Sequence, residues 1–115
     1  MYDTEEALPY SNIDAEEAQR LIGEGAHVVD VRQQDEWRTG HIAQATLVPI
    51  DGIYTFGKAL EEHQLPKDQD VIFVCASGRR SISASEIALL LGFQKVHNLT
   101  HGMHGWIGQG NPVER

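Results

Sequence analysis

The fold is decided by residues 71–91, which read VIFVCASGRRSISASEIALLL. The first four are apolar and rich in β-branched and aromatic side chains, which is typical of a buried strand in a parallel sheet. After a turn of small residues, apolar side chains recur with helical spacing at Ala84, Ile87, Ala88 and Leu91. Gly92 is placed to end this helix. The stretch therefore predicts a strand, a tight turn and a helix, with Cys75 between the strand and the helix.

The position of Cys75 has a chemical meaning. The first turn of a helix carries backbone N–H groups without partners and partial positive charge, so an anion is stabilised there. With Arg79 and Arg80 close by, we expect the thiol pKa to be lowered and the thiolate to be present at neutral pH. The alternative is a buried cysteine that serves as a small apolar residue. The small residues 76–78 and the two arginines favour a reactive thiol.

Strands alternate with helices along the rest of the chain, which predicts an α/β domain with a mostly parallel five-stranded sheet and helices on both faces. We expect a flexible N-terminal arm at residues 1–9, one domain at 10–110 and a C-terminal tail at 111–115. The predicted strands are 12–13, 27–31, 46–48, 71–74 and 95–98. Besides the central helix, helices are expected from Asp14, where Glu17 reaches back as in a capping box, and at 33–39, 58–64 and 101–107.

Composition narrows the class of protein. The 115 residues suit one domain, and the net charge of −8 argues against a nucleic-acid binder, which needs a basic face. A single cysteine permits no internal disulfide and no resolving thiol within the chain. The acidic N-terminus is not a secretory signal, and no apolar stretch is long enough to span a membrane. The expectation is a cytoplasmic protein without a membrane partner.

Asp30 stands in an otherwise apolar strand, and Arg32 follows two positions later. A carboxylate near the end of a buried strand needs partners. We expect a structural ion pair or a capping interaction rather than a direct chemical role.

Four motifs together resemble the single-domain rhodaneses, a family of sulfurtransferases, over residues 10–110. The first is Val29-Asp30-Val31-Arg32 with Glu36-Trp37 and Gly40-His41-Ile42, followed by Ala45 and Pro49. The second is VCASGRRS, from Val74 to Ser81. The third is Leu91-Gly92-Phe93 with Val96, and the fourth is Gly102-Met103-His104-Gly105-Trp106.

The resemblance implies a single rhodanese-like domain and a double displacement without a cofactor or metal. The Cys75 thiolate would take the outer sulfur of thiosulfate or a related persulfide donor, and a thiophilic acceptor would remove it: cyanide in vitro, a thiol in cells. The backbone amides of Ala76, Ser77, Gly78, Arg79 and Arg80 would form an anion-binding loop, with the arginines attracting an anionic donor. Which arginine faces the pocket stays open. Ser81 would support the loop or cap the helix.

The loop departs from the common family form at one position. Arginine often follows the cysteine there, whereas this chain has Ala76, which puts thiosulfate use in doubt. A second interpretation is therefore a persulfide carrier or interaction module that receives sulfur from a partner protein and turns thiosulfate over poorly. In the fourth motif His101 stands where an acidic residue is common, and we attach no function to that change.

Two further alternatives are weaker. A phosphatase or arsenate reductase of this fold needs arginine after five intervening residues, and here Ser81 stands at that position, with Arg80 one residue short. A metal site at His97, His101 and His104 lacks a cysteine or paired carboxylates to complete it. We expect solvated or capping histidines there, and a structural role for His41.

Overall fold

The computed structural model describes residues 9–115, so the predicted arm at residues 1–9 lies outside the described residues except for Pro9. Within this range five strands form one sheet, and all their pairings are parallel. They are β1 (Ser11–Ile13), β2 (His27–Asp30), β3 (Ala45–Leu47), β4 (Asp70–Val74) and β5 (Lys95–Leu99). Their order is β1-β5-β4-β2-β3, which places β4 at the centre.

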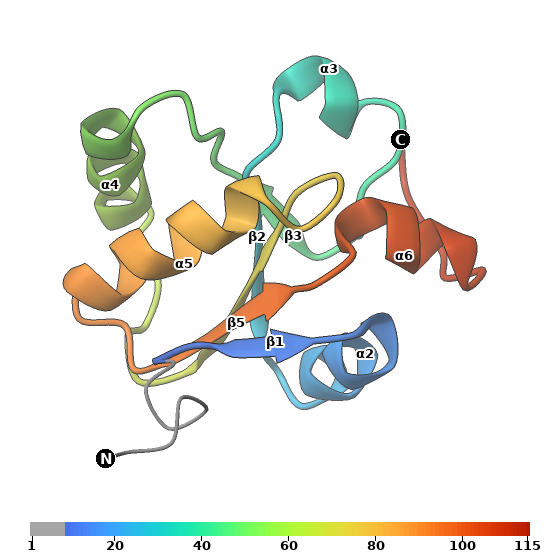
Figure 1. Cartoon of the computed structure of the whole chain (residues 1–115), viewed down its shortest axis with the longest axis horizontal. Helices are drawn as coiled ribbons and strands as arrows, with labels where there is room; N and C mark the ends of the chain where they lie inside the picture. Colours follow the sequence, from blue (N-terminus) through green and yellow to red (C-terminus); the bar gives the residue numbers. More distant parts are fainter. Residues whose placement is uncertain (1–8) are drawn as a thin grey trace, which may run out of the picture.

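Helices cover both faces of the sheet, which confirms the predicted α/β class (Figure 1). One face packs against α4 (Ile53–Glu62) and α5 (Arg80–Leu90), and the other packs against α2 (Ala15–Gly23) and α6 (Gly102–Gly108). The short α3 (Gln34–Trp37) follows β2. It buries none of its residues fully, and Trp37, the predicted apolar anchor, stacks on the ring of His41 with centroids 3.5 Å apart.

The core alternates between the two faces because successive side chains of a strand point to opposite sides. On β4, Val71 and Phe73 join the cluster that includes Phe56 and Leu60 of α4. Ile72 and Val74 join the opposite cluster, which includes the α2 and α6 residues Ala18, Leu21, Met103 and Trp106. The side chains on both faces of β4 are therefore buried, which explains why residues 71–74 are all apolar.

Helix α4 begins at Ile53, five residues earlier than the helix predicted at 58–64. Phe56 and Leu60 lie one turn apart and are fully buried, so they anchor this helix. Gly57 obscured the pattern in the sequence, since glycine disfavours helix interiors. A side chain at Gly57 would meet Ile87 at 3.6 Å, which shows how closely α4 approaches α5.

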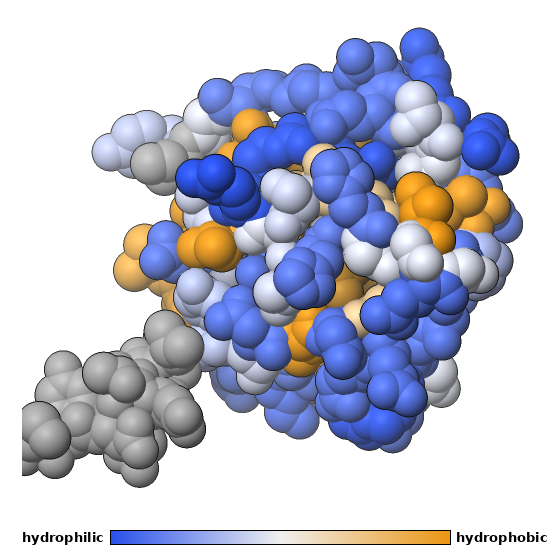
Figure 2. Space-filling model, turned by 45° about the vertical axis from the view of Figure 1, so that its right-hand side comes forward, coloured by the Kyte–Doolittle hydropathy of each residue, from blue (hydrophilic) through white to orange (hydrophobic). Residues whose placement is uncertain are grey.

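The two ends of the domain are fixed by local contacts. Asp14 caps α2 by accepting a hydrogen bond from the Glu17 amide, as predicted, but the Glu17 carboxylate pairs with Arg20 instead of reaching back to Asp14. Residues 111–115 fold against the domain, with Glu114 and His41 exchanging backbone hydrogen bonds. Among residues 9–115, no helix has the length and apolar character that crossing a membrane requires. The face in Figure 2 is largely hydrophilic, with separate hydrophobic patches.

Candidate functional site

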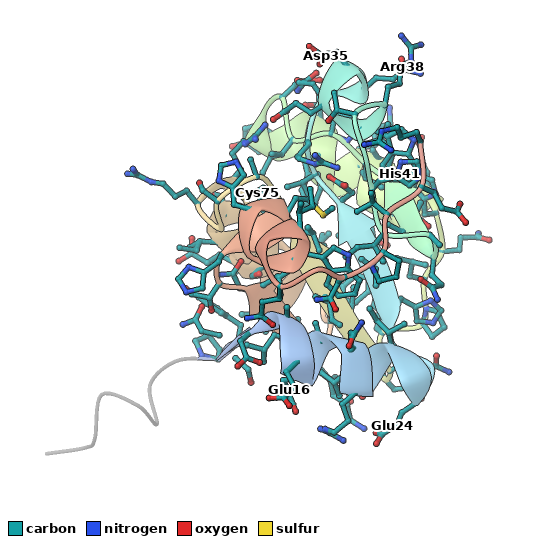
Figure 3. All side chains as sticks on the ribbon, turned by 90° about the vertical axis from the view of Figure 1, so that its right-hand side faces the viewer. Glu16, Glu24, Asp35, Arg38, His41 and Cys75 are labelled. Atoms are coloured by element: carbon teal, nitrogen blue, oxygen red, sulfur yellow. The ribbon has the colours of Figure 1, made fainter. Side chains whose placement is uncertain are left out.

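Cys75 lies where the paths of two neighbouring strands diverge. The chain leaves β2 toward β3 at one edge of the sheet, whereas it leaves β4 toward β5 on the other side. In open α/β sheets, the crevice at such a point, beyond the carboxyl ends of the strands, is the usual place for a site. Cys75 follows β4 directly, and α5 begins five residues later at Arg80, so the thiol lies just before the N-terminus of that helix. Figure 3 shows Cys75 close to α6, the helix drawn in pale red.

Two glycines let the loop at residues 75–80 pack against the chain that follows β5. Gly78 has a φ of +94°, and a side chain there would come within 1.8 Å of the Thr100 carbonyl oxygen. Gly102 has a φ of +53°, and a side chain there would come within 2.3 Å of the Cys75 carbonyl oxygen. Only glycine fits both the backbone conformation and the close approach at these positions.

Backbone hydrogen bonds from the first residues of α6 fix the loop at residues 75–80. The Met103 amide donates to the Cys75 carbonyl at 2.8 Å, and the His104 amide donates to the Ala76 carbonyl at 3.0 Å. With the carbonyls of Cys75 and Ala76 bound to α6, the amides of Ser77 and Gly78 face the sulfur.

The Cys75 sulfur is buried and surrounded by hydrogen-bond donors. The residue is 1% exposed. The Gly78 amide donates to Sγ at 3.1 Å, and the Ser81 hydroxyl lies 3.4 Å away. Burial acts to raise the pKa of the Cys75 thiol, but the Ser81 hydroxyl and the amides of Ser81, Gly78 and Ser77 together outweigh it, so the pKa falls below its ordinary value. A cysteine with these surroundings suits nucleophilic attack.

The two arginines have different environments. Arg80 forms a two-point ion pair with Glu36, with nitrogen–oxygen distances of 2.8 and 2.9 Å. Hydrogen bonds from Arg80 lower the pKa of Glu36 to about 2, against a weaker opposing effect of burial. The side chain of Arg79 is exposed, and no carboxylate within residues 9–115 pairs with it. Arg79 therefore has no carboxylate partner in this range, whereas Arg80, whose pKa is raised by Glu36 and by the nearby Cys75, is the arginine with charge contacts at the loop.

Asp30 and Arg32 form the expected ion pair at the end of β2. Both are buried, and Arg32 Nη2 lies 2.8 Å from Asp30 Oδ2. Arg32 also donates to the carbonyls of Gly40 and Glu36, so it ties the connection after β2 to the end of that strand. The pair fixes the segment that carries Glu36.

Ser81 does not cap α5, where Arg79 is the N-cap residue. It is fully buried and donates a hydrogen bond to Asn98 on β5. Sequence reasoning missed both Asn98 and Glu36 as parts of the site. Glu36 was visible only as part of a motif, and Asn98 carried no signal beyond being a polar residue in a buried strand.

The three histidines near the C-terminus do not lie together as ligands. His97 binds Asp70 at 2.7 Å, His101 precedes α6 as its N-cap residue, and His104 is exposed on α6. Among the described residues, no three histidine, cysteine, aspartate or glutamate side chains converge as metal ligands would.

A low-pKa thiol held by backbone amides at the head of a helix is typical of proteins that form a covalent intermediate on cysteine. The chain belongs to the rhodanese-like domain family, whose sequence model matches residues 14–109. The resemblance inferred from the four motifs is thus confirmed.

Similar proteins cover most of the chain. Uncharacterized protein YibN of Escherichia coli K12 is 40% identical over 101 residues, which cover 86% of this chain and 68% of YibN. Thiosulfate sulfurtransferase GlpE of Pseudomonas fluorescens is 35% identical over 97 residues, or 84% of each protein. The crystal structure of a rhodanese-related protein from Thermoplasma volcanium matches with a TM-score of 0.76 at 30% identity, and the match covers 91% of this chain and 98% of that one.

Proposed function

We propose that this chain transfers sulfane sulfur from a donor to a thiophilic acceptor through a persulfide on Cys75. The observation that supports this best is the surroundings of Sγ, which lies 3.1 Å from the Gly78 amide at the head of α5. Relatives named as sulfurtransferases support sulfur transfer as the general activity.

The reaction has two displacements at sulfur. The Cys75 thiolate attacks the outer sulfur of the donor, a new S–S bond forms, and the donor's own bond to that sulfur breaks. The leaving group departs with the bonding electron pair, as sulfite from thiosulfate or as a thiolate from a persulfide. The acceptor then attacks the outer sulfur of the persulfide, and the Cys75 thiolate is restored. No electrons are gained or lost overall, so no redox cofactor is needed.

The burial of Cys75 favours donors whose transferable sulfur is a terminal atom. At 1% exposure, Sγ is reachable only by a terminal atom that enters the loop. Once loaded, the outer sulfur stands about 2.05 Å beyond Sγ, the length of an S–S bond. The acceptor thus meets the outer sulfur rather than Sγ, and the loop amides remain to hold the negative charge.

The charges near the loop bear on the identity of the donor. Glu36 neutralises Arg80, which leaves Arg79 as the cation free to attract an anion. Ala76 adds no charge beside the sulfur. A dianion such as thiosulfate is therefore held less strongly than two free arginines would hold it. This favours the second candidate, a carrier that takes sulfur from a protein persulfide, and thiosulfate remains the small donor to test first.

The experiment is intact-protein mass spectrometry after treatment with thiosulfate, before and after cyanide. The proposal predicts a gain of one sulfur atom that cyanide removes and that Cys75→Ser lacks. Ser83→Ala is the matched control, because it removes an exposed hydroxyl from α5 outside the loop at residues 75–80. If thiosulfate does not load the chain, a persulfide-bearing protein is offered next. Failure of both donors with a thiol that is still reactive would overturn the proposed function, and phosphate and arsenate esters would then be tested.

A further inference from the structure

A chain of buried side chains connects the Cys75 sulfur to the edge of the sheet. The Ser81 hydroxyl lies 3.4 Å from Sγ and donates a short hydrogen bond to Asn98 Oδ1. Asn98 Nδ2 in turn donates to Asn12 Oδ1 at 3.0 Å. Ser81 and Asn98 are at most 1% exposed, whereas Asn12 is exposed on the edge strand β1. These three residues link α5, β5 and β1 to the sulfur.

Counting hydrogens fixes the direction of these bonds. A serine hydroxyl has one hydrogen, and an amide oxygen has none. Ser81 must therefore give its hydrogen to Asn98, and its contact with Cys75 must be filled by the thiol hydrogen. In this arrangement Ser81 accepts from the neutral thiol. An ionised sulfur in the same place would face a lone pair of Ser81, so the hydroxyl can lower the thiol pKa only after it has turned to donate to the anion.

The opposite arrangement requires both amides to turn. If the Asn98 side chain reverses, its Nδ2 donates to Ser81, and the Ser81 hydrogen is free to point at the sulfur anion. Asn98 Oδ1 then faces Asn12, whose own amide must turn to donate to it. The reversal also gives up the long hydrogen bond of 3.5 Å from Asn98 Nδ2 to the Gly78 carbonyl, which favours the first arrangement. Asn12 can turn readily because it is exposed to water. These are rotations only, and the thiol proton leaves to solvent.

We propose that Ser81, Asn98 and Asn12 form a reversible hydrogen-bond relay that determines whether the Ser81 hydroxyl accepts from the Cys75 thiol or donates to its anion. Asn98 and Asn12 are then positioning residues that act on the sulfur through Ser81. The inference builds on the proposed role of Cys75 as nucleophile, but it concerns the ionisation of the thiol and is measured without sulfur transfer.

Other titratable and charged residues lie on the elements packed against the loop, and the test leaves them unchanged. They are Arg79 and Arg80 at the start of α5, Glu36 paired with Arg80, the Asp30–Arg32 pair at the end of β2, and His101 and His104 at the start of α6. Because the chain has one cysteine, the ultraviolet absorbance of the thiolate reports on Cys75 alone. A titration of that absorbance gives the thiol pKa directly.

The sharpest variant is Asn12→Asp, at an exposed position where folding is little affected. A carboxylate only accepts, so it holds Asn98 Nδ2 toward β1 and Oδ1 toward Ser81, which keeps the thiol arrangement. We expect the Cys75 pKa to rise measurably, with each unit lowering the thiolate fraction about tenfold below the pKa. Ser11→Asp is the matched control, because it adds the same charge one residue away, where the structure gives no side-chain contact with Asn98. Equal shifts in the two variants would mean that charge alone acts and would overturn the relay.

A second pair of variants tests whether Asn98 acts through Ser81. Asn98→Leu leaves Ser81 without its acceptor and free to donate to the anion, so the Cys75 pKa should fall. In a Ser81→Ala background the same change should have a much smaller effect on the titration, since only the long contact of Asn98 with the Gly78 carbonyl then connects Asn98 to the loop. Ser85→Ala controls for the loss of a buried hydroxyl, since Ser85 bonds to the Ser81 carbonyl and not to the sulfur. An Asn98→Leu shift of the same size with and without Ser81 would overturn the relay.

Discussion

Arg80 and Glu36 are 44 residues apart in the chain and form a two-point ion pair beside the Cys75 loop. One residue follows β4 and the other follows β2, so the pair crosses the point where the two connections diverge. It fixes the head of α5 to α3 and also removes one of the two cations that the sequence offered to a donor.

This pairing predicts that Arg79 and Glu36 have opposite effects on the KM for thiosulfate. Arg79→Ala should raise KM about two- to fivefold, as expected for the loss of an exposed charge interaction of about 0.5–1 kcal/mol. Glu36→Gln should lower KM by a similar factor, because it leaves Arg80 uncompensated. Steady-state kinetics at low and high salt measure both effects, which should shrink as salt rises. A KM unaffected by either change would show that charge at the loop does not select the donor.

The double variant Arg80→Ala with Glu36→Gln is the control for this series. Arg80→Ala alone exposes the Glu36 carboxylate and should raise KM. The second change removes that negative charge and should bring KM back toward the wild-type value. If the double variant is as poor as Arg80→Ala alone, Arg80 acts through its shape and contacts rather than its charge.

The same ion pair should make stability depend on pH in acid. The folded-state pKa of Glu36 is about 2, lowered from 4.5, so its contribution is complete above about pH 4.5 and is lost as pH falls toward 2. Denaturant unfolding of the wild type and Glu36→Gln across this range should give a difference in free energy that is constant near neutral pH and shrinks in acid. A difference that stays constant down to pH 2 would contradict the assignment.

Gly78→Ala should damage the loop more than an ordinary glycine substitution. The new side chain would have to occupy a positive φ and would meet the Thr100 carbonyl, so we expect destabilisation of about 2 kcal/mol or more and a weaker amide contact with the sulfur. Thermal unfolding and the Cys75 thiol titration measure the two effects. Gly108→Ala is the matched control, because a side chain there meets no atom within 4 Å. Its stability should stay within about 1 kcal/mol of the wild type.

Removing one partner of the Asp30–Arg32 pair should lower stability without abolishing chemistry. Asp30→Asn leaves the buried Arg32 charge uncompensated, which typically costs about 3–5 kcal/mol. We expect a large loss in denaturant unfolding, while the folded fraction still forms the persulfide at low temperature. A folded Asp30→Asn protein that cannot be loaded with sulfur would mean that Asp30 takes part in the reaction.

Local patterns were enough to predict the sheet and the place of the thiol. The apolar run before Cys75 and the helical spacing after it depend only on neighbouring residues, and both were confirmed. The partners of Arg80 and Ser81 were not predictable in this way. Glu36 and Asn98 reach them only because β2 and β5 flank β4, and strand order is not encoded in local periodicity. The early start of α4 was hidden by Gly57, whose value lies in the approach to α5 rather than in helix propensity.

The backbone hydrogen bonds between α6 and the Cys75 loop have a consequence for the order of synthesis and folding. The amides that hold the Cys75 and Ala76 carbonyls belong to Met103 and His104, close to the C-terminal end of the matched domain. The Cys75 loop therefore cannot reach its folded conformation until Met103 and His104 have been synthesised and have docked against it. A chain that stopped before these residues would keep Cys75 but lose the contacts that fix the carbonyls of Cys75 and Ala76.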